Sequence, residues 1–417
     1  MCGPTRRVLP LCPRTNPCFR ECLRVRDSLI HTSGTFPPGE LKSTVAYQGQ
    51  IPLSFGSDPD KQALFARYEE VAWVEQLHWQ RHYQRRKLLG AGGQGAVYLA
   101  QHDGADGFSR PIALKVFSPE PYPSRKAYEE DMGMVGRACA KVALLQSDHI
   151  VDIHDFVVHQ GLRLLEMEWI DGFDLREILK PETIALTRER HPPERVEYIE
   201  RVILGPGTKQ PRLQPGVAIS ILRDCLAGLA TLNQAGLVHG DIKPGNIMVT
   251  RMGRSKLIDI GSAVDLRQST VRHVWSPAYA APEVLEGGRS TPQSDLASLG
   301  YVLIEMLSGQ FPFEGCTTYP QLAQAKRELE QRLPELIPAE VVESEMLMTL
   351  CQRLIAANPA DRFPSAHAAE LGEDGAAGFH DRRDAAAVLA RGLVRSNRPR
   401  RRRTRLADHR PPDEVPD

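Results

Sequence analysis

The chain has 417 residues, 41% of them apolar, so it can bury a large core and form two or three folding units. Lysine plus arginine (52) equals aspartate plus glutamate (52), a balance that argues against a dedicated nucleic-acid binder. No stretch reaches the roughly 18 consecutive apolar residues of a membrane span. Residues 1–22 also lack the apolar centre of a secretory signal. We therefore expect a cytoplasmic protein.

Residues 1–57 are rich in Pro, Arg, Ser and Thr and show no sustained periodicity, which predicts a disordered segment. This segment contains four of the eight cysteines, Cys2, Cys12, Cys18 and Cys22. Only Cys18 and Cys22 are spaced like half of a zinc site, so a zinc or redox role for this group stays a hypothesis. The scattered cysteines Cys139, Cys225, Cys316 and Cys351 are expected to be mostly buried and inert.

Apolar residues recur at helical spacing between Asp58 and Trp79, including Leu64, Tyr68 and Val71. Asp58 or Asp60 is available to cap the first turn. We therefore expect residues 58–82 to form a helix that packs on the domain that follows.

Residues 83–370 are predicted to form one α+β domain with two lobes. Short β-type runs come first and a helical stretch follows at about 125–146, with two further strands expected around Ile150 and Leu164. After Phe173 the pattern is mostly helical. A small sheet-rich lobe followed by a helical lobe places the natural ligand site in the cleft between them.

Three segments do not fit this plan. Residues 181–215 are polar, contain Pro and Gly, and look like an insertion, for which we expect partner docking. Residues 371–394 predict a short helical extension. The Arg-rich residues 395–417 predict a disordered tail, with nucleic-acid contact by residues 398–405 as the alternative.

Residues 90–97 form a GxGxxG run between two β-type segments. A dinucleotide-binding turn has the same spacing but leads into a helix, whereas Val97, Tyr98 and Leu99 continue here as a strand. This context favours a glycine-rich hairpin whose backbone N–H groups approach phosphates. Downstream, Lys115 shares one side of an apolar strand with Ala113 and Phe117, which indicates an anionic partner such as ATP phosphates.

The run from Val238 to Asn246 carries the most specific pattern, because Asp241, Lys243 and Asn246 lie on one tight loop. In phosphoryl transfer an aspartate orients and deprotonates the attacking hydroxyl, a lysine offsets phosphoryl charge and an asparagine oxygen binds Mg²⁺. Asp259, eighteen residues after Asp241, ends another apolar strand and supplies a second Mg²⁺ ligand.

In this order and spacing, the chain resembles the eukaryotic-type serine/threonine protein kinase family, in a bacterial style. The resemblance implies ATP and Mg²⁺ as cofactors, protein substrates bearing Ser or Thr, catalytic roles for Asp241, Lys243 and Lys115, and metal ligands Asn246 and Asp259. It also implies a set of nucleotide-binding residues: Leu89, Gly90, Ala91, Gly92, Gly93, Gln94, Gly95, Val97, Ala113, Lys115, Met167, Glu168, Ile170 and Asp174.

Further residues match the family's helical lobe. Residues 281–283 (Ala-Pro-Glu) resemble the end of the activation segment, and Arg362 the arginine that pairs with Glu283. Asp295 resembles the buried aspartate that braces the catalytic loop. Lys243 and Ser276 follow the serine/threonine pattern rather than the tyrosine one.

Two departures from the family pattern have consequences. Gly240 stands where the family has an arginine that pairs with a phosphorylated activation loop, which predicts activity that does not strictly require that phosphorylation. Ala138 stands where alignment expects the helix glutamate that pairs with Lys115. Either a neighbouring acid (Asp131, Glu129 or Glu130) replaces it, or the ion pair is missing.

Two other function classes remain as alternatives. A histidine–glycine–aspartate loop followed by an asparagine also resembles small-molecule phosphotransferases of the aminoglycoside and choline kinase type. Those usually carry His where this chain has Lys243, and they lack an Ala-Pro-Glu ending. The missing helix glutamate would suit a catalytically weak pseudokinase that acts as a scaffold.

Overall fold

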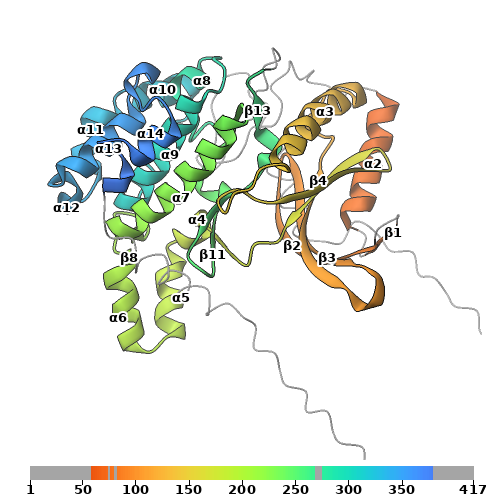
Figure 1. Cartoon of the computed structure of the whole chain (residues 1–417), viewed down its shortest axis with the longest axis horizontal. Helices are drawn as coiled ribbons and strands as arrows, with labels where there is room; N and C mark the ends of the chain where they lie inside the picture. The colour runs from red at the N-terminus through yellow and green to blue at the C-terminus, as the bar shows by residue number, and fades with distance from the viewer. Residues whose placement is uncertain (1–57, 74–75, 79–81, 268–274, 379–417) are drawn as a thin grey trace, which may run out of the picture.

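The computed structural model describes residues 58–73, 76–78, 82–267 and 275–378, which form two lobes (Figure 1). The smaller lobe is built on an antiparallel sheet and the larger one is predominantly helical. This arrangement confirms the expected two-lobed α+β fold. Predictions for residues 1–57, for residues 379–394 of the expected helical extension 371–394 and for the tail 395–417 lie outside the described residues, as do the four early cysteines.

The small lobe contains a six-stranded sheet in the order β1-β2-β3-β4-β6-β5, in which all neighbours are antiparallel. The strands are β1 (Gln76–His78), β2 (His82–Gly92), β3 (Gly95–Asp103), β4 (Ser109–Phe117), β5 (Ile153–His159) and β6 (Leu162–Glu168). The strand expected around Ile150 starts later than predicted, at Ile153, and forms β5. Ile150 forms only an isolated bridge with Leu257, and Val151 donates to the Leu257 carbonyl, so this segment joins the helical lobe.

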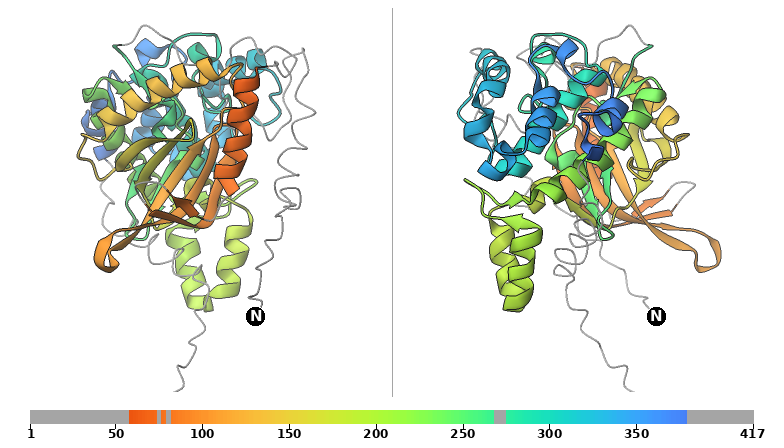
Figure 2. Two further views of the ribbon diagram at one scale, coloured as in Figure 1. Left: turned by 90° about the vertical axis from the view of Figure 1, so that its right-hand side faces the viewer. Right: turned by 60° about the vertical axis from the view of Figure 1, so that its left-hand side comes forward.

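Two helices cover opposite faces of this sheet. Helix α3 (Arg125–Val142) lies on the face that carries Lys115, where Gly136 leaves room for the Phe156 ring. Helix α2 (Pro59–Trp73) packs against the other face, and the hydroxyl of Tyr98 donates to the Ala72 carbonyl. The helix expected over 58–82 is therefore shorter than predicted, because Gln76–His78 pairs with β2 as a strand. Asp58 caps this helix with a hydrogen bond of 3.0 Å from the Asp60 N–H. Figure 2 shows α3 along one edge of the sheet with α2 beside it.

The large lobe is organised around α9 (Pro292–Ser308), in which every residue from Ser294 to Ser308 is buried. A methyl group at Gly300 would lie 2.7 Å from an Ile355 side-chain carbon, so this glycine permits close helix packing. The other helices of this lobe are α4 (Leu175–Ile178), α7 (Pro215–Gln234), α8 (Pro282–Leu285), α10 (Tyr319–Arg327), α11 (Leu329–Leu336), α12 (Ala339–Val342), α13 (Glu345–Ile355) and α14 (Ala366–Leu371).

Helix α7 is, within the described residues, the one helix long and apolar enough to cross a membrane. Its apolar window is 61% buried inside the fold. Core helices of large domains show the same property, and α7 packs against α9, α14 and β12 (Ser255–Leu257).

Short strands at the lobe junction hold the loops that carry the candidate site residues. Strands β7 (Gly172–Asp174), β11 (Ile247–Thr250) and β12 form one small sheet, and β10 (Leu237–Val238) pairs with β13 (Val264–Asp265). The loop from 239 to 246 runs between β10 and β11 and ends in a 3-10 turn, η3 (Pro244–Asn246). A second turn, η4 (Ile260–Ser262), follows Asp259.

The segment 181–215 is ordered as two helices and a small hairpin. Helices α5 (Glu182–Arg190) and α6 (Pro193–Val202) project from the lobe, and β8 (Leu204–Gly205) pairs with β9 (Arg212–Leu213) (Figure 1). The hairpin is anchored at the end of α9, where the Lys209 and Gln210 N–H groups both donate to the Gly309 carbonyl.

Candidate active site

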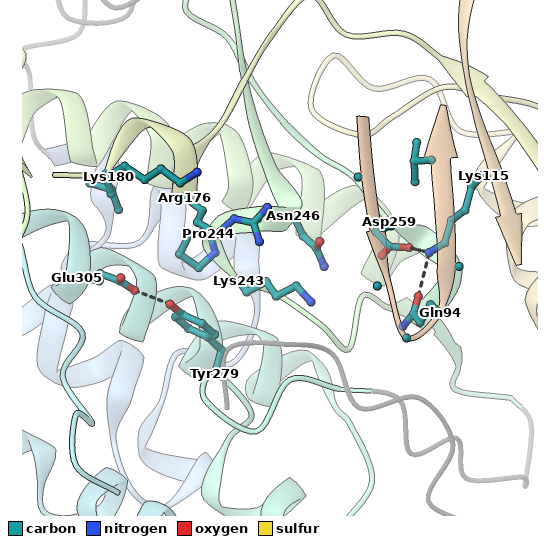
Figure 3. Close-up of a pocket in the computed structure, with 18 of the residues that line it drawn as sticks. Gln94, Lys115, Arg176, Lys180, Lys243, Pro244, Asn246, Asp259, Tyr279 and Glu305 are labelled. Carbon is teal, nitrogen blue, oxygen red and sulfur yellow. Dashed lines mark hydrogen bonds and ion pairs between the residues drawn. The ribbon is translucent and has the colours of Figure 1, made fainter. Parts of the chain in front are cut away.

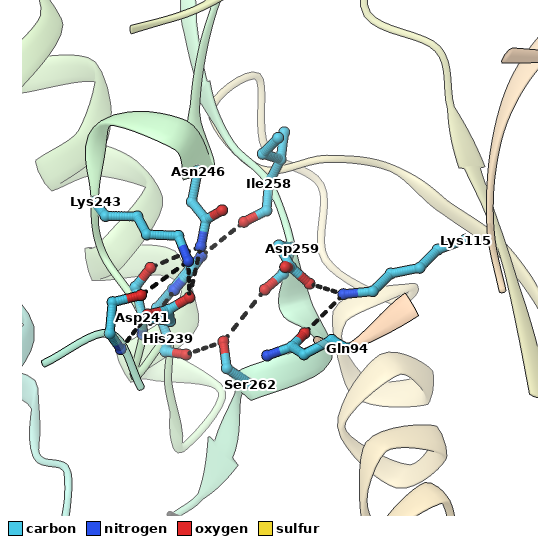
Figure 4. A network of polar contacts seen from close by, with 10 residues as sticks. Gln94, Lys115, His239, Asp241, Lys243, Asn246, Ile258, Asp259 and Ser262 are labelled. Carbon is cyan, nitrogen blue, oxygen red and sulfur yellow. Dashed lines mark hydrogen bonds and ion pairs between the residues drawn. The ribbon is translucent and has the colours of Figure 1, made fainter. Parts of the chain in front are cut away.

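The catalytic loop presents Asp241 with its carboxylate held on several sides. The Ser276 N–H donates to Oδ1 at 2.8 Å, and Asn246 Nδ2 donates to Oδ2 at 3.0 Å. Lys243 Nζ lies 2.8 Å from the same Oδ2 (Figure 4). It also donates to the Ser276 hydroxyl at 2.9 Å. The loop therefore brings together the three polar residues predicted from its sequence and joins them to Ser276.

Asp295 braces this loop from the buried helix α9. Its carboxylate accepts hydrogen bonds from the His239 N–H at 2.7 Å and the Gly240 N–H at 2.9 Å. Burial raises the pKa of Asp295 to about 6, although both hydrogen bonds favour its charged form. Asp295 therefore holds the backbone of the catalytic loop directly, as its resemblance to the family's buried aspartate predicted.

Gly240 adopts a left-handed backbone conformation, with φ of +78°. A Cβ atom here would lie 3.1 Å from the Ser262 carbonyl oxygen. Glycine adopts such a conformation without the steric penalty that other residues meet, so the sequence difference at this position relaxes the backbone next to Asp241.

Asp259 and Lys115 meet across the two lobes. Lys115 Nζ lies 2.5 Å from Asp259 Oδ1 and donates to Gln94 Oε1 at 2.9 Å (Figure 4). Burial acts to raise the pKa of Asp259, but Lys115, with Lys243 and His239 nearby, lowers that pKa overall. Asp259 has a φ of +63°, which is unusual for a residue other than glycine and typical of functional sites.

The acids of α3 have other partners. Asp131 accepts a hydrogen bond of 2.6 Å from the Tyr122 hydroxyl. Glu129 pairs with Arg125 at 2.9 Å, and Glu130 lies 3.9 Å from Lys126. Within the described residues, the ion pair of Lys115 is with Asp259, so the possibility that one of these acids replaces the helix glutamate is not realised in this structure.

The glycine-rich loop is the hairpin between β2 and β3. Gly95 has a φ of +135°, and a Cβ there would lie 1.9 Å from the Val116 carbonyl oxygen, so only glycine fits. A Cβ atom at Gly90, Gly92 or Gly93 would meet nothing within 4 Å. The backbone of the hairpin is therefore uncovered at these glycines, and residues 90–95 line a cavity.

A cavity of about 350 Å³ lies between this hairpin and the catalytic loop (Figure 3). It is lined by residues of both lobes: Gly90, Ala91, Gly92, Gly93, Gln94, Gly95, Val97, Lys115, Arg176, Leu179, Lys180, Pro181, Gln210, Lys243, Pro244, Gly245, Asn246, Asp259, Tyr279 and Glu305. Most of the residues predicted to hold phosphates and metal therefore share one cavity.

The residues expected around the adenine and ribose do not line this cavity: Leu89, Ala113, Met167, Glu168, Ile170 and Asp174. Ala113 and Met167 are register partners on β4 and β6. Glu168 pairs with Lys256, and Asp174 caps α4 by accepting from the Glu177 N–H at 2.9 Å. Burial raises the pKa of Asp174.

The oxygen donors fit a Mg²⁺ ion with substrate phosphates better than a site built from protein ligands alone. Asn246 and Asp259 line the cavity together, while no group of three or more His, Cys, Asp or Glu among the described residues could hold a metal. Mg²⁺ commonly takes one or two protein oxygens and completes its shell with phosphates and water.

Arg362 and Glu283 form the predicted ion pair of the helical lobe. Arg362 Nη1 and Nη2 donate to the two carboxylate oxygens of Glu283 at 2.7 and 3.0 Å. The guanidinium is fully buried and also donates to the Ala356 carbonyl at 2.8 Å. The pair fixes the end of the segment that carries Ser276.

Five polar cavity residues were not anticipated from the sequence. Arg176 and Lys180 lie at and after α4, Gln210 comes from the insertion hairpin, and Tyr279 and Glu305 from the helical lobe. No short motif unites them, because they come from segments far apart in the sequence that only the tertiary fold brings together.

Comparison with known proteins agrees with these features. A family model described as protein kinase domain matches residues 83–371. The serine/threonine-protein kinase PrkC of Bacillus subtilis is 30% identical over 240 residues, which are 56% of this chain and 31% of PrkC. PknD of Mycobacterium tuberculosis is 30% identical over 314 residues (74% and 42%), and PknL of the same species 31% over 289 residues (68% and 63%).

The chain thus spans less than two thirds of the length of these relatives. The family match nevertheless covers both lobes and all of the catalytic loop. Together with the placement of Asp241, Lys243, Asn246 and Asp259, it confirms that the chain belongs to the eukaryotic-type serine/threonine protein kinase family.

Proposed function

We propose that this chain transfers the γ-phosphoryl group of ATP to serine or threonine hydroxyls of proteins. The observation that carries the proposal is the arrangement around Asp241, whose carboxylate is fixed by Ser276 and Asn246 beside Lys243. The glycine-rich hairpin and Lys115 face this group from the other lobe. Catalysis of this kind depends almost entirely on positioning and electrostatics.

Asp241 is proposed to orient the substrate hydroxyl and to accept its proton at a carboxylate oxygen. Only 3% of the residue is exposed, so its hydrogen bonds with Ser276 and Asn246 set the direction of the carboxylate before a substrate arrives. Lys243, held between Asp241 and the Ser276 hydroxyl, is placed to offset negative charge on the transferring group.

ATP with Mg²⁺, when bound, supplies the phosphoryl group and the divalent charge that such transfer requires. Asn246 and Asp259 would hold the ion. Lys115 and the backbone N–H groups of residues 90–95 would hold the phosphates, and binding would exchange part of the contact between Lys115 and Asp259 for contacts with ligand. The nucleotide base would lie toward Met167, Glu168 and Ile170. A cytoplasmic location would supply both ATP and Mg²⁺.

The hydrogen bond between Lys243 and Ser276 favours a protein substrate over a small molecule. It links the catalytic loop to the segment ending at Glu283, which Arg362 anchors in the lobe. A pseudokinase scaffold is the second candidate, because within the described residues Lys115 pairs with Asp259 rather than with an acid of α3. All groups needed for transfer are nevertheless present in or beside one cavity.

The deciding experiment compares the purified chain with its Asp241→Asn variant for transfer of labelled phosphate to generic proteins, followed by phosphoamino-acid analysis. We expect phosphoserine or phosphothreonine, and a loss of about 10²- to 10⁴-fold in the variant. Asp148→Asn, at an exposed surface position, is the matched control. Nucleotide binding without transfer to any protein would instead favour the scaffold.

A further inference from the structure

The cavity extends past the catalytic loop into an end that the nucleotide does not need. This distal end is formed by Arg176, Lys180, Tyr279 and Glu305 (Figure 3), together with Gln210, which donates to Glu305. Pro244 and Gly245, which follow Lys243 on the catalytic loop, line the same cavity. In the proposed reaction the substrate would bind beside Lys243. The side chains here would therefore meet residues that flank the phosphoacceptor hydroxyl.

Among the described residues, the one carboxylate that lines the distal end is already bonded through both oxygens. Glu305 Oε2 accepts a hydrogen bond of 2.6 Å from the Tyr279 hydroxyl, and Oε1 accepts one of 3.1 Å from Gln210 Nε2. Glu305 is 3% exposed. A basic substrate side chain would have to displace these buried contacts to reach it, which disfavours basic residues at this position.

The two cations of the distal end are accessible. The side chains of Arg176 and Lys180 are 65% and 47% exposed. Arg176 lies 3.6 Å from Asp174, and Lys180 lies 2.6 Å from Glu177, but neither carboxylate lines the cavity. The first pair is long and the second is exposed on both sides, so both contribute little energy and both cations can turn to a ligand.

Gly245 brings Arg176 close to the catalytic loop. A Cβ at Gly245 would lie 3.7 Å from the guanidinium carbon of Arg176, so the guanidinium lies directly beside this loop position. Gly245 immediately precedes Asn246, which itself contacts Asp241. The positive charge of Arg176 is therefore near the place where the acceptor residue binds.

The insertion fixes the opposite wall of the distal end. Gly207 and Gly309 pack so closely that a Cβ on Gly207 would lie 2.6 Å from the Gly309 Cα. The Gln210 N–H donates to the Gly309 carbonyl at 2.9 Å, which directs the Gln210 amide to Glu305. The insertion thus has a function in the site beyond projecting its two helices.

We propose that this distal end selects acidic peptides, with Arg176 and Lys180 binding an aspartate or glutamate side chain close to the phosphoacceptor. The proposal rests on the proposed kinase function and names its substrate class. Gln210 and Tyr279 contribute by occupying both oxygens of Glu305, the carboxylate of the distal end that would otherwise bind a basic residue.

The test uses serine peptides in which glutamate or lysine is placed in turn at each position flanking the acceptor. We expect at least one position where glutamate exceeds lysine in kcat/KM by about tenfold or more. The double variant Arg176→Glu/Lys180→Glu should abolish or reverse the preference while leaving the KM for ATP nearly unchanged. Lys126→Glu, on the 85% exposed side chain of α3, is the matched control.

A parallel arm measures binding of the same peptides with alanine at the acceptor, by fluorescence anisotropy at low and high salt. Salt-sensitive binding of the glutamate peptide that the double variant loses would support the proposal even if no peptide were phosphorylated, a result that would overturn the kinase function alone. Phosphorylation with equal or better use of lysine peptides, or a preference unchanged in the double variant, would overturn the substrate proposal and leave the kinase function intact.

Discussion

Lys115 Nζ lies 2.5 Å from Asp259 Oδ1, and the same ammonium donates a second hydrogen bond to the Gln94 side chain at 2.9 Å. The lysine of the small lobe is therefore oriented by the proposed metal ligand Asp259 and by the tip of the glycine-rich hairpin. Helix α3 contributes the buried Ala138 at the position where an acid was expected. In this chain Gln94 of the hairpin, rather than an acid of α3, helps to position Lys115.

Gln94→Ala should weaken nucleotide use. Removing the amide takes one hydrogen bond from a charged, buried partner, and such bonds contribute about 1.5–3 kcal/mol. We expect a higher KM for ATP and a lower kcat, measured by steady-state kinetics. Gln94→Glu, which restores an acceptor with a charge, should be less impaired.

The control for Gln94 is Gln101→Ala on β3, whose amide bonds Ser109 away from the cavity. Equal kinetics for Gln94→Ala and Gln101→Ala would show that the hairpin tip does not position Lys115.

The chemistry of the site could be predicted because its residues are close in sequence. Asp241, Lys243 and Asn246 lie within one loop, and Asp259 follows the next hairpin. Their spacing in the sequence was therefore enough to predict that these four side chains lie close together. Apolar alternation also indicated the strand that carries Lys115.

Features assembled from distant segments could not be predicted in this way. The insertion has a polar sequence, yet it forms two helices and a hairpin. The close approach of Gly207 and Gly309 lets the hairpin dock at the end of α9. The partners of Glu166 on the sheet come from four other strand positions and leave no motif. The hydrogen bond from Lys115 to Gln94 depends on where the tip of the glycine-rich hairpin lies. The spacing of residues in the sequence does not define that position.

Gly240→Ala should destabilise the catalytic loop. A residue with a Cβ in the left-handed region is disfavoured by roughly 1–2 kcal/mol, and here the Cβ also approaches the Ser262 carbonyl at 3.1 Å. Urea unfolding should show the loss, and kcat should fall because Asp241 is the next residue. Gly287→Ala is the matched control, with φ of +90° but no atom within 4 Å of its Cβ. Equal losses in both variants would show that strain acts without the Ser262 contact.

Activity should not strictly require phosphorylation of the activation segment. Gly240 offers no cation at the position where the family arginine would bind a phosphate, so a phosphorylated loop gains no partner there. The chain treated with phosphatase should retain most of its activity toward a peptide, measured from initial rates before autophosphorylation resumes. Near-complete loss after treatment, restored by preincubation with ATP, would contradict this expectation.

Ser276→Ala should lower kcat with little change in stability. The variant loses the 2.9 Å hydrogen bond from Lys243 to the hydroxyl but keeps the backbone bond to Asp241. A lost bond to a charged group predicts a decrease of about tenfold or more in kcat. Ser276→Thr keeps a hydroxyl and should retain most of the activity at a similar urea midpoint. Full activity in Ser276→Ala would show that the hydroxyl does not position Lys243.

Glu166 should make the small lobe sensitive to acid. This fully buried carboxylate accepts hydrogen bonds from the Tyr83 hydroxyl and from Arg110 at 2.7 Å, and His102 and His154 lie 3.2 and 3.6 Å away. Burial acts to raise the pKa of Glu166, but the surrounding donors lower it from 4.5 to about 2. Because the folded-state pKa is depressed, the stabilisation is present above pH 4.5 and is lost as the pH falls toward 2.

Glu166→Gln removes the carboxylate and tests this linkage. A depression of this size corresponds to about 3 kcal/mol, so the variant should be less stable by a similar amount at about pH 7. The difference from the unmodified chain should shrink as the pH is lowered from 4.5 toward 2, as measured by urea unfolding at each pH. Glu130→Gln, at an exposed position of α3, is the control for the loss of one acid. A constant difference between Glu166→Gln and the unmodified chain across this range would show that hydrogen bonding, rather than ionisation of Glu166, accounts for its contribution.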